Sequence, residues 1–423
     1  MLAIYRLGVF VSTPGVDVAA LRAMFDTSAG TIFGMVNMFS GGSLERFSIF
    51  TLGIMPYISV SIIIQFLTPA IPALEALKKE GASGQRIITR YTRQGTIALA
   101  LFQSFLIAKG LQASPGLVLN PGWSFVISTM ITLTAGTAFI MWLSEQITER
   151  GIGNGMSIII FAGIIARMPS AFISTLALAR EGQIQPITIL ILIAFSIATI
   201  AAIVFVERSM RKIPVQYPRR MSGADKQMGI PQFMPLKVNM AGVLPPIFAY
   251  AIIVIPGTVA GFNSNETLQD VVAWISPGEP LYYILLVALI FVCAFYCTAV
   301  IYNPVEVADN LKKNGAFIPT VRPGKDTADY LYAVTTRLTV WGGIYIALVC
   351  IIPEMFYLNM GVSSFSYVFG GTAILIAVGV TLDTLSQIES HIVSRNYESF
   401  MSKGSGSKGP GGSMRMRTKV LKR

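Results

Sequence analysis

The stretch 47–73, FSIFTLGIMPYISVSIIIQFLTPAIPA, determines how the rest of the chain is interpreted. It lies in an uncharged run of 28 residues, which is longer than the roughly 20 apolar residues that an α-helix needs to cross a bilayer. Ile54, Ile58 and Ile62 recur at steps of four, so they lie along one side of a helix. The run therefore predicts a membrane-spanning helix, and its isoleucine side is most simply a packing face.

The whole chain has the composition of a membrane protein. Of its 423 residues, 53% are hydrophobic and 13% are charged, whereas about a quarter of the residues are charged in a typical soluble domain. Residues 1–12 are apolar but too short to cross a membrane alone, and we interpret them as the end of a first span. Nine uncharged runs are further candidates for spans: 47–74, 94–108, 110–144, 151–166, 182–206, 238–265, 280–305, 338–353 and 355–382. The sequence thus predicts an all-α polytopic membrane protein with ten transmembrane helices.

The basic residues lie mostly on one side of the predicted membrane. If alternate loops are assigned to one side, that side carries 26 of the 32 Lys and Arg residues. Loops that face the cytoplasm carry an excess of Lys and Arg, so we place this side, and both termini with it, in the cytoplasm. The formal net charge of +11 is therefore attributed to membrane topology rather than to nucleic-acid binding.

The spans divide evenly around an external connection at 167–186. We expect an N-terminal half, 1–166, with spans one to five, and a C-terminal half, 187–387, with spans six to ten. A basic cytoplasmic tail, 388–423, follows. Such an even division suggests two pseudo-symmetric halves, which transport folds often relate by an inverted two-fold axis.

Two long cytoplasmic loops belong to the C-terminal half. In the first loop, 207–237, the alternation of residues from Lys212 to Tyr217 and again before Lys237 predicts a short two-stranded ribbon. The second loop, 306–337, contains a sharp Arg322-Pro323-Gly324 turn. Both loops are candidates for contact with partners in the cytoplasm.

No sequence pattern points to catalysis. Cys293, Cys297 and Cys350 all fall within apolar runs with no nearby His or carboxylate, so we interpret them as packing residues rather than metal ligands. The single histidine, His391, lies in the tail without a catalytic constellation. No Walker loop, GxSxG or HExxH motif is present. We therefore expect no enzyme activity, no metal and no cofactor.

Several long motifs, in order along the chain, resemble one known family. The chain is similar to SecY, the channel subunit of the bacterial protein-translocation complex, from about Tyr5 to Phe400. The motifs that carry the resemblance are NMFSGGSLERFSIFTLGIMPYISVSIIIQ, KKEGASGQRIITRYTRQGT, MWLSEQITERGIGNGMSIIIFAGI, PLKVNMAGVLPPIF, NPVEVADNLKKNGAFIPTVRPGK and TRLTVWGGIYIALVCIIPE.

The resemblance implies a clamshell of ten helices that is hinged near 167–186 and opens sideways between spans two and seven. It implies a ring of apolar side chains that constricts the pore, carried onto Ile54, Ile58, Met156, Ile160, Ile247 and Ile376. Met156 departs from the isoleucine that is usual in the family. A half-helix at about 32–46 would plug the pore from outside, with its central residues Asn37, Met38, Phe39, Ser40, Gly41 and Gly42.

The resemblance also implies a lateral gate and sites for partners. Gln65 and Ile62 would belong to the lateral gate. Docking of partners would involve Arg322, Pro323, Gly324, Arg219 and Arg220. The implied partners are the subunits SecE and SecG, the ATPase SecA, the ribosome with its RNA, membrane lipid, and nascent or secretory polypeptides with signal sequences. The implied location is the cell inner membrane.

The residues alone leave other interpretations open. Ile54, Ile58 and Ile247 can be ordinary packing or lipid-facing residues, Gln65 can bond to its own helix, and 32–46 can be an ordinary re-entrant turn. A lipid scramblase or a purely structural scaffold is one alternative, but it predicts no such long cytoplasmic docking loops. A secondary transporter of a small solute also fits ten spans in two halves. Such transporters usually place ionisable groups at the membrane midplane, whereas the interiors of these spans are nearly free of charge.

Overall fold

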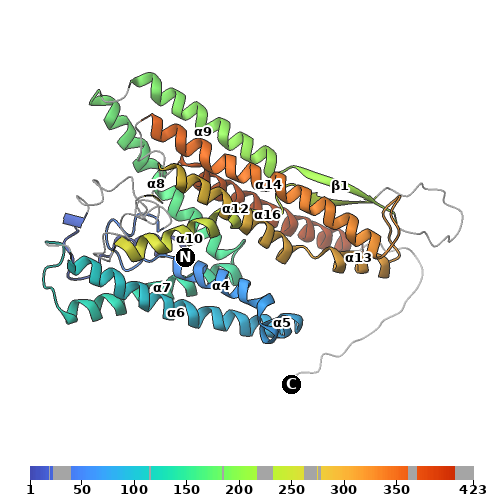
Figure 1. The fold of residues 1–423 in the computed structure, drawn as a ribbon, viewed down its shortest axis with the longest axis horizontal. Coiled ribbons are helices and arrows are strands. Elements are labelled where there is room, and N and C mark those ends of the chain that lie inside the picture. The colour runs from blue at the N-terminus through green and yellow to red at the C-terminus, as the bar shows by residue number, and fades with distance from the viewer. Residues whose placement is uncertain are drawn as a thin grey trace, which may run out of the picture.

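The computed structural model describes residues 1–18, 20–21, 40–113, 116–182, 185–216, 232–261, 274, 278–360 and 369–404. Long helices run roughly side by side, with α6 and α7 on one side of the molecule and α9, α14 and α16 on the other (Figure 1). Seven of the described helices are long and apolar enough to cross a membrane. They are α6 (Ala82–Ala113), α7 (Trp123–Arg150), α8 (Gly155–Arg180), α9 (Pro186–Glu207), α12 (Pro280–Ile301), α14 (Lys325–Asn359) and α16 (Gly371–Gly404).

Further helices occupy the remaining expected positions. Helices α4 (Met55–Ala70) and α5 (Pro72–Lys79) form one apolar pair that is bent by 96° and count as an eighth span if taken together. Helix α1 (Leu2–Gly8) and helix α10 (Leu244–Gly261) lie where spans one and seven are expected. The all-α polytopic architecture is confirmed, and the count of ten spans agrees with this order of helices.

The stretch that opened the sequence analysis is helical only from Met55 onward, so the prediction of a helix from residue 47 was wrong at its start. Residues before it form tight turns in which the single proton of the Ser43 hydroxyl is shared between two carbonyl acceptors, Ser40 at 2.7 Å and Phe50 at 2.8 Å. Such side-chain bonds to the backbone compete with helix formation. The helix starts with Pro56 in its first turn, a position where the missing N–H costs nothing.

Helix α8 is longer than the sequence predicted. It continues to Arg180 with Pro169 inside it, so most of the expected external connection 167–186 is helix. The apolar and small residues after Pro169 keep the helical period, with Ala171 and Thr175 buried on one face. The connection between the two halves is therefore the short link between α8 and α9.

The predicted ribbon is confirmed in the loop 207–237. Strand β1 (Met210–Val215) pairs antiparallel with β2 (Gln232–Lys237). An isolated bridge between Gln216 and Phe317 joins the ribbon to the loop between helix α13 (Pro304–Lys313) and α14. The described parts of the loops 207–237 and 306–337 thus form one unit. Arg219 and Arg220 lie outside the described residues.

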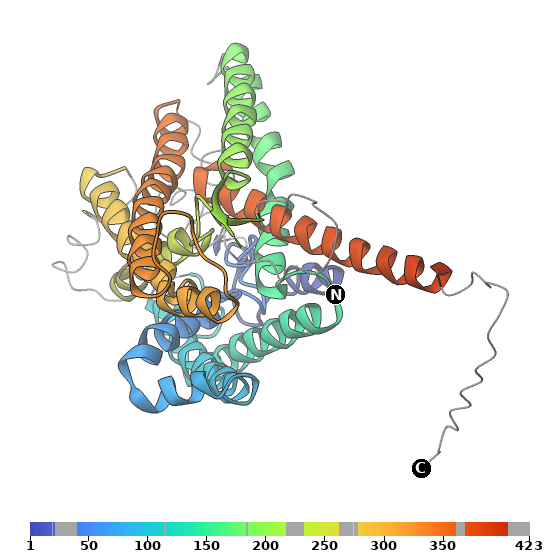
Figure 2. The same ribbon diagram turned by 90° about the vertical axis from the view of Figure 1, so that its right-hand side faces the viewer.

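The C-terminal tail begins as a helix. Helix α16 continues to Gly404, so the first part of the expected tail 388–423 extends the last span. Figure 2 shows this end of α16 projecting beyond the other helices.

The main core lies between the helices of both halves. The cluster of buried hydrophobic residues draws members from α4, α7, α8, α10, α12, α14 and α16. All three cysteines are buried in it, at 4% exposure or less, as expected of packing residues.

Candidate functional site

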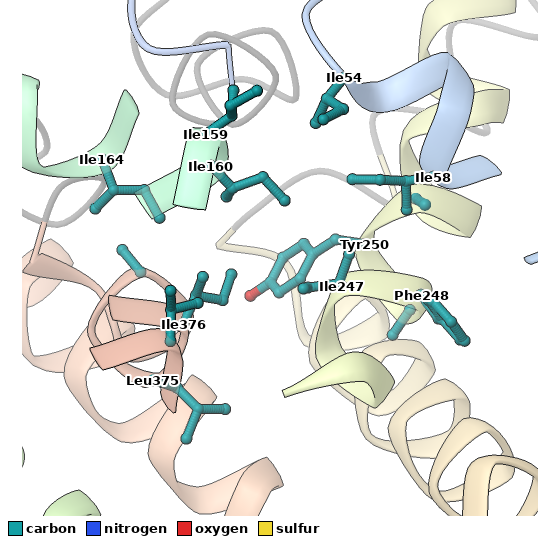
Figure 3. Packing of buried hydrophobic residues seen from close by; sticks show 14 of the residues in the cluster. Ile54, Ile58, Ile159, Ile160, Ile164, Ile247, Phe248, Tyr250, Leu375 and Ile376 are labelled. Atoms are coloured by element: carbon teal, nitrogen blue, oxygen red, sulfur yellow. The ribbon is translucent and has the colours of Figure 1, made fainter. Parts of the chain in front are cut away.

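The six side chains assigned to the constriction come together from four helices. Helix α4 contributes Ile58 and, at the residue before its start, Ile54. Helix α8 contributes Met156 and Ile160, helix α10 contributes Ile247, and helix α16 contributes Ile376. The five isoleucines are 9% exposed or less, and the half-buried Met156 packs against them. Figure 3 shows Ile54, Ile58, Ile160, Ile247 and Ile376 pointing toward a common space. Residues separated by more than 300 positions in the sequence thus form one apolar cluster.

The cluster has a further member that sequence reasoning missed. The ring of Tyr250 lies beside Ile247 and Ile376 (Figure 3). Tyr250 is one helical turn after Ile247 and is 2% exposed. Its spacing of three from a proposed ring residue was the only available sequence signal.

The apolar cluster forms the floor of a cavity. This cavity has a volume of about 730 Å³, and four members of the cluster line it: Ile58, Met156, Ile160 and Ile247. Its wall is polar, with Ser61, Thr89, Ser144 and an ion pair of 2.6 Å between Arg93 Nε and Glu145 Oε1. A second hollow of about 420 Å³ shares Asn154, Ser157 and Gln387 with the first. Together the two hollows form an entrance of mixed polar and apolar lining on the predicted cytoplasmic side.

The tight turn between α7 and α8 positions one side of the floor. Asn154 caps α8, because its side-chain oxygen accepts the backbone N–H of Met156 at 3.1 Å. The N–H of Gly153 donates to Gln387 Oε1 on α16 at 2.8 Å. The start of α8 is therefore fixed to the other half of the molecule. Met156 and Ile160, one turn apart, consequently face the cavity.

The described part of the expected plug is a compact joint. Gly41 and Gly42 have φ values of +67° and +85°, a left-handed conformation that glycine adopts without penalty. A Cβ on Gly41 would lie 3.0 Å from the Cα of Gly163 on α8 and 3.3 Å from the Tyr5 hydroxyl. Gly41 is therefore required by backbone conformation and by close packing. Asn37, Met38 and Phe39 lie outside the described residues.

Charged side chains hold this joint in place. Arg6 Nη1 donates to the Gly41 carbonyl at 2.9 Å, and Arg167 Nη2 lies 3.3 Å from Glu45 Oε2. The guanidinium of Arg46 lies 4.3 Å from the centre of the Phe10 ring, in the range of a cation–π contact. Residues from α1 and α8 thus clamp the segment 40–46. The sequence analysis did not identify Arg6, Glu45 or Arg167 as functional.

One buried carboxyl lies within a membrane-length helix. Glu354, on α14, is 7% exposed, and its Oε1 has no hydrogen-bond partner among the described residues. This carboxyl is an exception to the expectation that span interiors are nearly free of charge. The sequence signal for a special position here was Pro353, the residue before Glu354, because a proline inside a helix disturbs it locally.

The two residues assigned to the lateral gate lie on the same helix but differ in their surroundings. Ile62 is 6% exposed and belongs to the main core. Gln65 lines the cavity, and its Nε2 lies 3.2 Å from the Ser61 hydroxyl of the same helix. Helix α4 contacts α10 on the neighbouring side of the cavity. This pair of helices forms a seam between the two halves.

The docking candidates Arg322, Pro323 and Gly324 form an exposed turn before α14. Arg322 and Pro323 are exposed, and the Arg322 carbonyl accepts the Thr327 hydroxyl at 2.8 Å. Gly324 has a φ of +113°, which favours glycine. The guanidinium is therefore presented on a rigid turn beside the β1–β2 ribbon.

These features define a class of protein: a polytopic helical membrane protein in two halves, with a cavity that ends on a cluster of apolar side chains. A family model described as SecY matches residues 48–385. The chain belongs to the SecY family.

Relatives from several bacteria are similar over nearly their whole length. The protein translocase subunit SecY of Escherichia coli is 48% identical over 410 residues, which cover 95% of this chain and 92% of the relative. The same subunit of Haemophilus influenzae is 47% identical, with 95% and 92% covered. That of Rickettsia bellii is 46% identical, with 95% and 94% covered. These relatives carry the names of translocase subunits rather than of enzymes.

Solved structures share the fold. A structure described as a protein conducting channel has a TM-score of 0.65 at 16% identity and covers 93% of this chain and 90% of that chain. Sec61 in a canine ribosome-channel complex has a TM-score of 0.61 at 15% identity, with 93% and 90% covered. The arrangement of helices is therefore that of this group of channels.

Proposed function

We propose that this chain is the protein-conducting channel through which signal-bearing polypeptides cross the cell inner membrane and from which membrane segments are released sideways into lipid. The observation that carries the proposal is the apolar floor of the cavity, made by Ile58, Met156, Ile160 and Ile247 in a chain of the SecY family.

An apolar constriction suits a channel that must stay closed to ions and open to polypeptide. An ion in the constriction would lose its hydration with no compensating partner. A polypeptide can displace the side chains, because they offer no polar group that would retain it. Met156 keeps the ring apolar, and its flexible side chain adapts to different neighbours.

The ring, plug and gate roles extend this proposal. The segment 32–46 acts as the plug, with Gly41 and Gly42 at its joint, and the seam beside Gln65 and Ile62 acts as the lateral gate. The link between α8 and α9, within 167–186, acts as the hinge. The halves also contact each other through α4 and α10, and we assign the opening to this seam.

The cytoplasmic loops 207–237 and 306–337 act as the docking unit for partners. We assign them to SecA and the ribosome, and we assign SecE and SecG as the subunits that complete the complex in the membrane. Arg322 is pre-positioned on its turn for an acidic protein group or an RNA phosphate, and Arg219 and Arg220 of the loop 207–237 are further docking candidates. Both termini lie in the cytoplasm.

A secondary transporter of a small solute is the less favoured function. It would need a polar binding site near the membrane midplane, whereas the cavity ends on isoleucine and methionine side chains. The family of the chain also favours the channel.

Import into vesicles tests the proposed function. Vesicles that contain this chain with SecE and SecG are supplied with a signal-bearing preprotein, and protease-protected preprotein is measured. We expect protection only when SecA and ATP are both present. Equal protection without SecA and without a ribosome would contradict a channel driven by a partner.

The same vesicles test the docking turn. Arg322→Glu reverses the charge at the exposed turn and is expected to reduce SecA-driven import at least tenfold, while the complex still assembles. Lys325→Glu, three residues away at the start of α14, is the matched control and is expected to have a smaller effect. Equal import by the Arg322→Glu variant and the unmodified chain would remove Arg322 from the docking role.

A further inference from the structure

A carbonyl in the seam lacks its normal helix partner. In α4, the residue four positions after Gln65 is Pro69, which has no backbone N–H to donate to the Gln65 carbonyl. The proline ring also pushes this carbonyl away from the helix axis. An unpaired backbone carbonyl at membrane depth is unfavourable, because no lipid group can donate to it. The Gln65 carbonyl therefore requires a donor from outside its own helix.

That donor comes from the other half of the molecule. The Tyr296 hydroxyl, on α12, donates a hydrogen bond to the Gln65 carbonyl. The Tyr296 ring also stacks on Phe66, the next residue of α4, with ring centroids 3.8 Å apart and an angle of 11° between the planes. One side chain from the C-terminal half thus satisfies the backbone of α4 and packs on its neighbouring side chain.

The position of this contact matters for opening. The chain passes from one half to the other only between α8 and α9, and α8 also contacts α16. The Tyr296 contact joins α4 to α12, which packs against α10, so it lies beside the seam of α4 and α10. Separation of α4 from α12 must break the hydrogen bond and the ring contact together. The Gln65 side chain lines the cavity, so the same turn of α4 borders the space that a polypeptide would occupy.

We propose that Tyr296 is a releasable clasp that holds the seam closed, and that Pro69 creates the acceptor for it. This inference rests on the proposed function, because it assumes that the seam opens during transport. Tyr296 is a positioning residue in this role: it sets the balance between the closed and open seam. A segment that enters the seam compensates for the lost bond, either by donating to the Gln65 carbonyl or by admitting water to it.

The expected effect follows from the size of one hydrogen bond. Removal of the Tyr296 hydroxyl should raise the ratio of open to closed seam about fivefold, which is the effect of a typical net hydrogen bond. Tyr296→Phe removes only the hydroxyl and keeps the ring that stacks on Phe66. Tyr302→Phe is the matched control, because the buried Tyr302 hydroxyl, near the end of the same helix, has no hydrogen-bond partner among the described residues.

The measurement is the distribution of distances between two spin labels in the assembled complex. The labels replace Ile63 on α4 and Val292 on α12, which are 49% and 61% exposed, in a background with Cys293→Ala, Cys297→Ala and Cys350→Ala. We expect the long-distance population to rise about fivefold in Tyr296→Phe and to stay unchanged in Tyr302→Phe. An unchanged distribution in both variants would overturn the inference.

A second variant separates the clasp from simple packing. Pro69→Ala restores an N–H that can donate to the Gln65 carbonyl within α4. In that background the effect of Tyr296→Phe should fall to less than about twofold, because the two changes act on one acceptor. If Tyr296 acts through packing alone, its effect will be the same with proline or alanine at position 69, and the proposal will be wrong.

The inference and the proposed function fail in different ways. If the unmodified complex imports preprotein and its distances do not respond to Tyr296→Phe, the clasp is wrong and the channel stands. If the unmodified complex imports nothing under SecA and ATP, the proposed function fails whatever the distances are.

Discussion

The proposed constriction and the joint of segment 40–46 are held together by different kinds of contact. The proposed constriction contains buried apolar side chains, among them Ile58, Ile160, Ile247 and Ile376. The joint is held by directional contacts: Arg6 donates to the Gly41 carbonyl at 2.9 Å, and Arg167 pairs with Glu45 at 3.3 Å.

This difference fits two different tasks. Apolar contacts are non-directional and can re-form around many shapes, which suits the proposed ring around a polypeptide. Hydrogen bonds and ion pairs require defined partner positions, which suits the plug that we propose for this segment. We therefore expect changes in the ring to affect ion leakage most, and changes in the joint to affect how reliably the closed state re-forms.

The largest effect is expected from a polar residue in the ring. Ile247→Asn places an amide among the isoleucines, where it supports water and lowers the barrier to ions. We expect the resting ion conductance of the complex in planar bilayers to rise by on the order of tenfold or more. Ile247→Leu keeps the volume and the apolar character and serves as the control. A conductance of Ile247→Asn equal to that of Ile247→Leu would count against the ring.

A smaller effect is expected from a methyl group at the joint. Gly41→Ala suffers the left-handed strain of about 1–2 kcal/mol and also meets Gly163, because its Cβ would lie 3.0 Å from the Gly163 Cα. Gly42→Ala is the control within the joint: it has the same kind of strain, but its nearest neighbour would be 3.8 Å away. We expect Gly41→Ala to lower the thermal stability of the complex more than Gly42→Ala, and to raise resting conductance about threefold. Equal stability of the two variants would show that the close approach to α8 is unimportant.

The smallest effect is expected from the ion pair. The Arg167 and Glu45 side chains are 24% and 33% exposed, so solvent screens their attraction and the pair contributes about 0.5–1 kcal/mol. Arg167→Gln should raise resting conductance about twofold, and the double exchange Arg167→Glu with Glu45→Arg should restore part of the closure. High salt should raise the conductance of the unmodified complex and have little further effect on Arg167→Gln. Failure of the exchange to recover any closure would assign Arg167 a role that does not depend on Glu45.

Much of the fold could be predicted from the sequence because it depends on long apolar runs and on the placement of charges. The spans from α6 to α9 and the β1–β2 ribbon follow from hydropathy, charge and alternation. The start of α4 at Met55 could not be predicted in this way, since the preceding residues are also apolar. What stops the helix there is a local set of hydroxyl bonds around Ser43.

The site was only partly accessible to sequence reasoning. Periodicity placed Ile54, Ile58 and Ile62 on one side of a helix, but the meeting of that helix with Met156, Ile247 and Ile376 came from the family resemblance. The Arg167–Glu45 pair joins residues 122 positions apart, and no local pattern links them. Pro69 was a visible signal for an unpaired carbonyl, but its donor, Tyr296, lies 231 positions from the acceptor.

The most direct test of the channel asks which side chains a polypeptide touches while it crosses. A photoreactive residue is placed in turn at Ile58, Ile160 and Ile247, and at Ile197 on α9 as a control that is 62% exposed. A preprotein is then arrested part-way through import. We expect covalent products with the preprotein from all three constriction positions and none from position 197. Products of equal yield at position 197, or none at the constriction, would contradict a polypeptide path through the apolar ring.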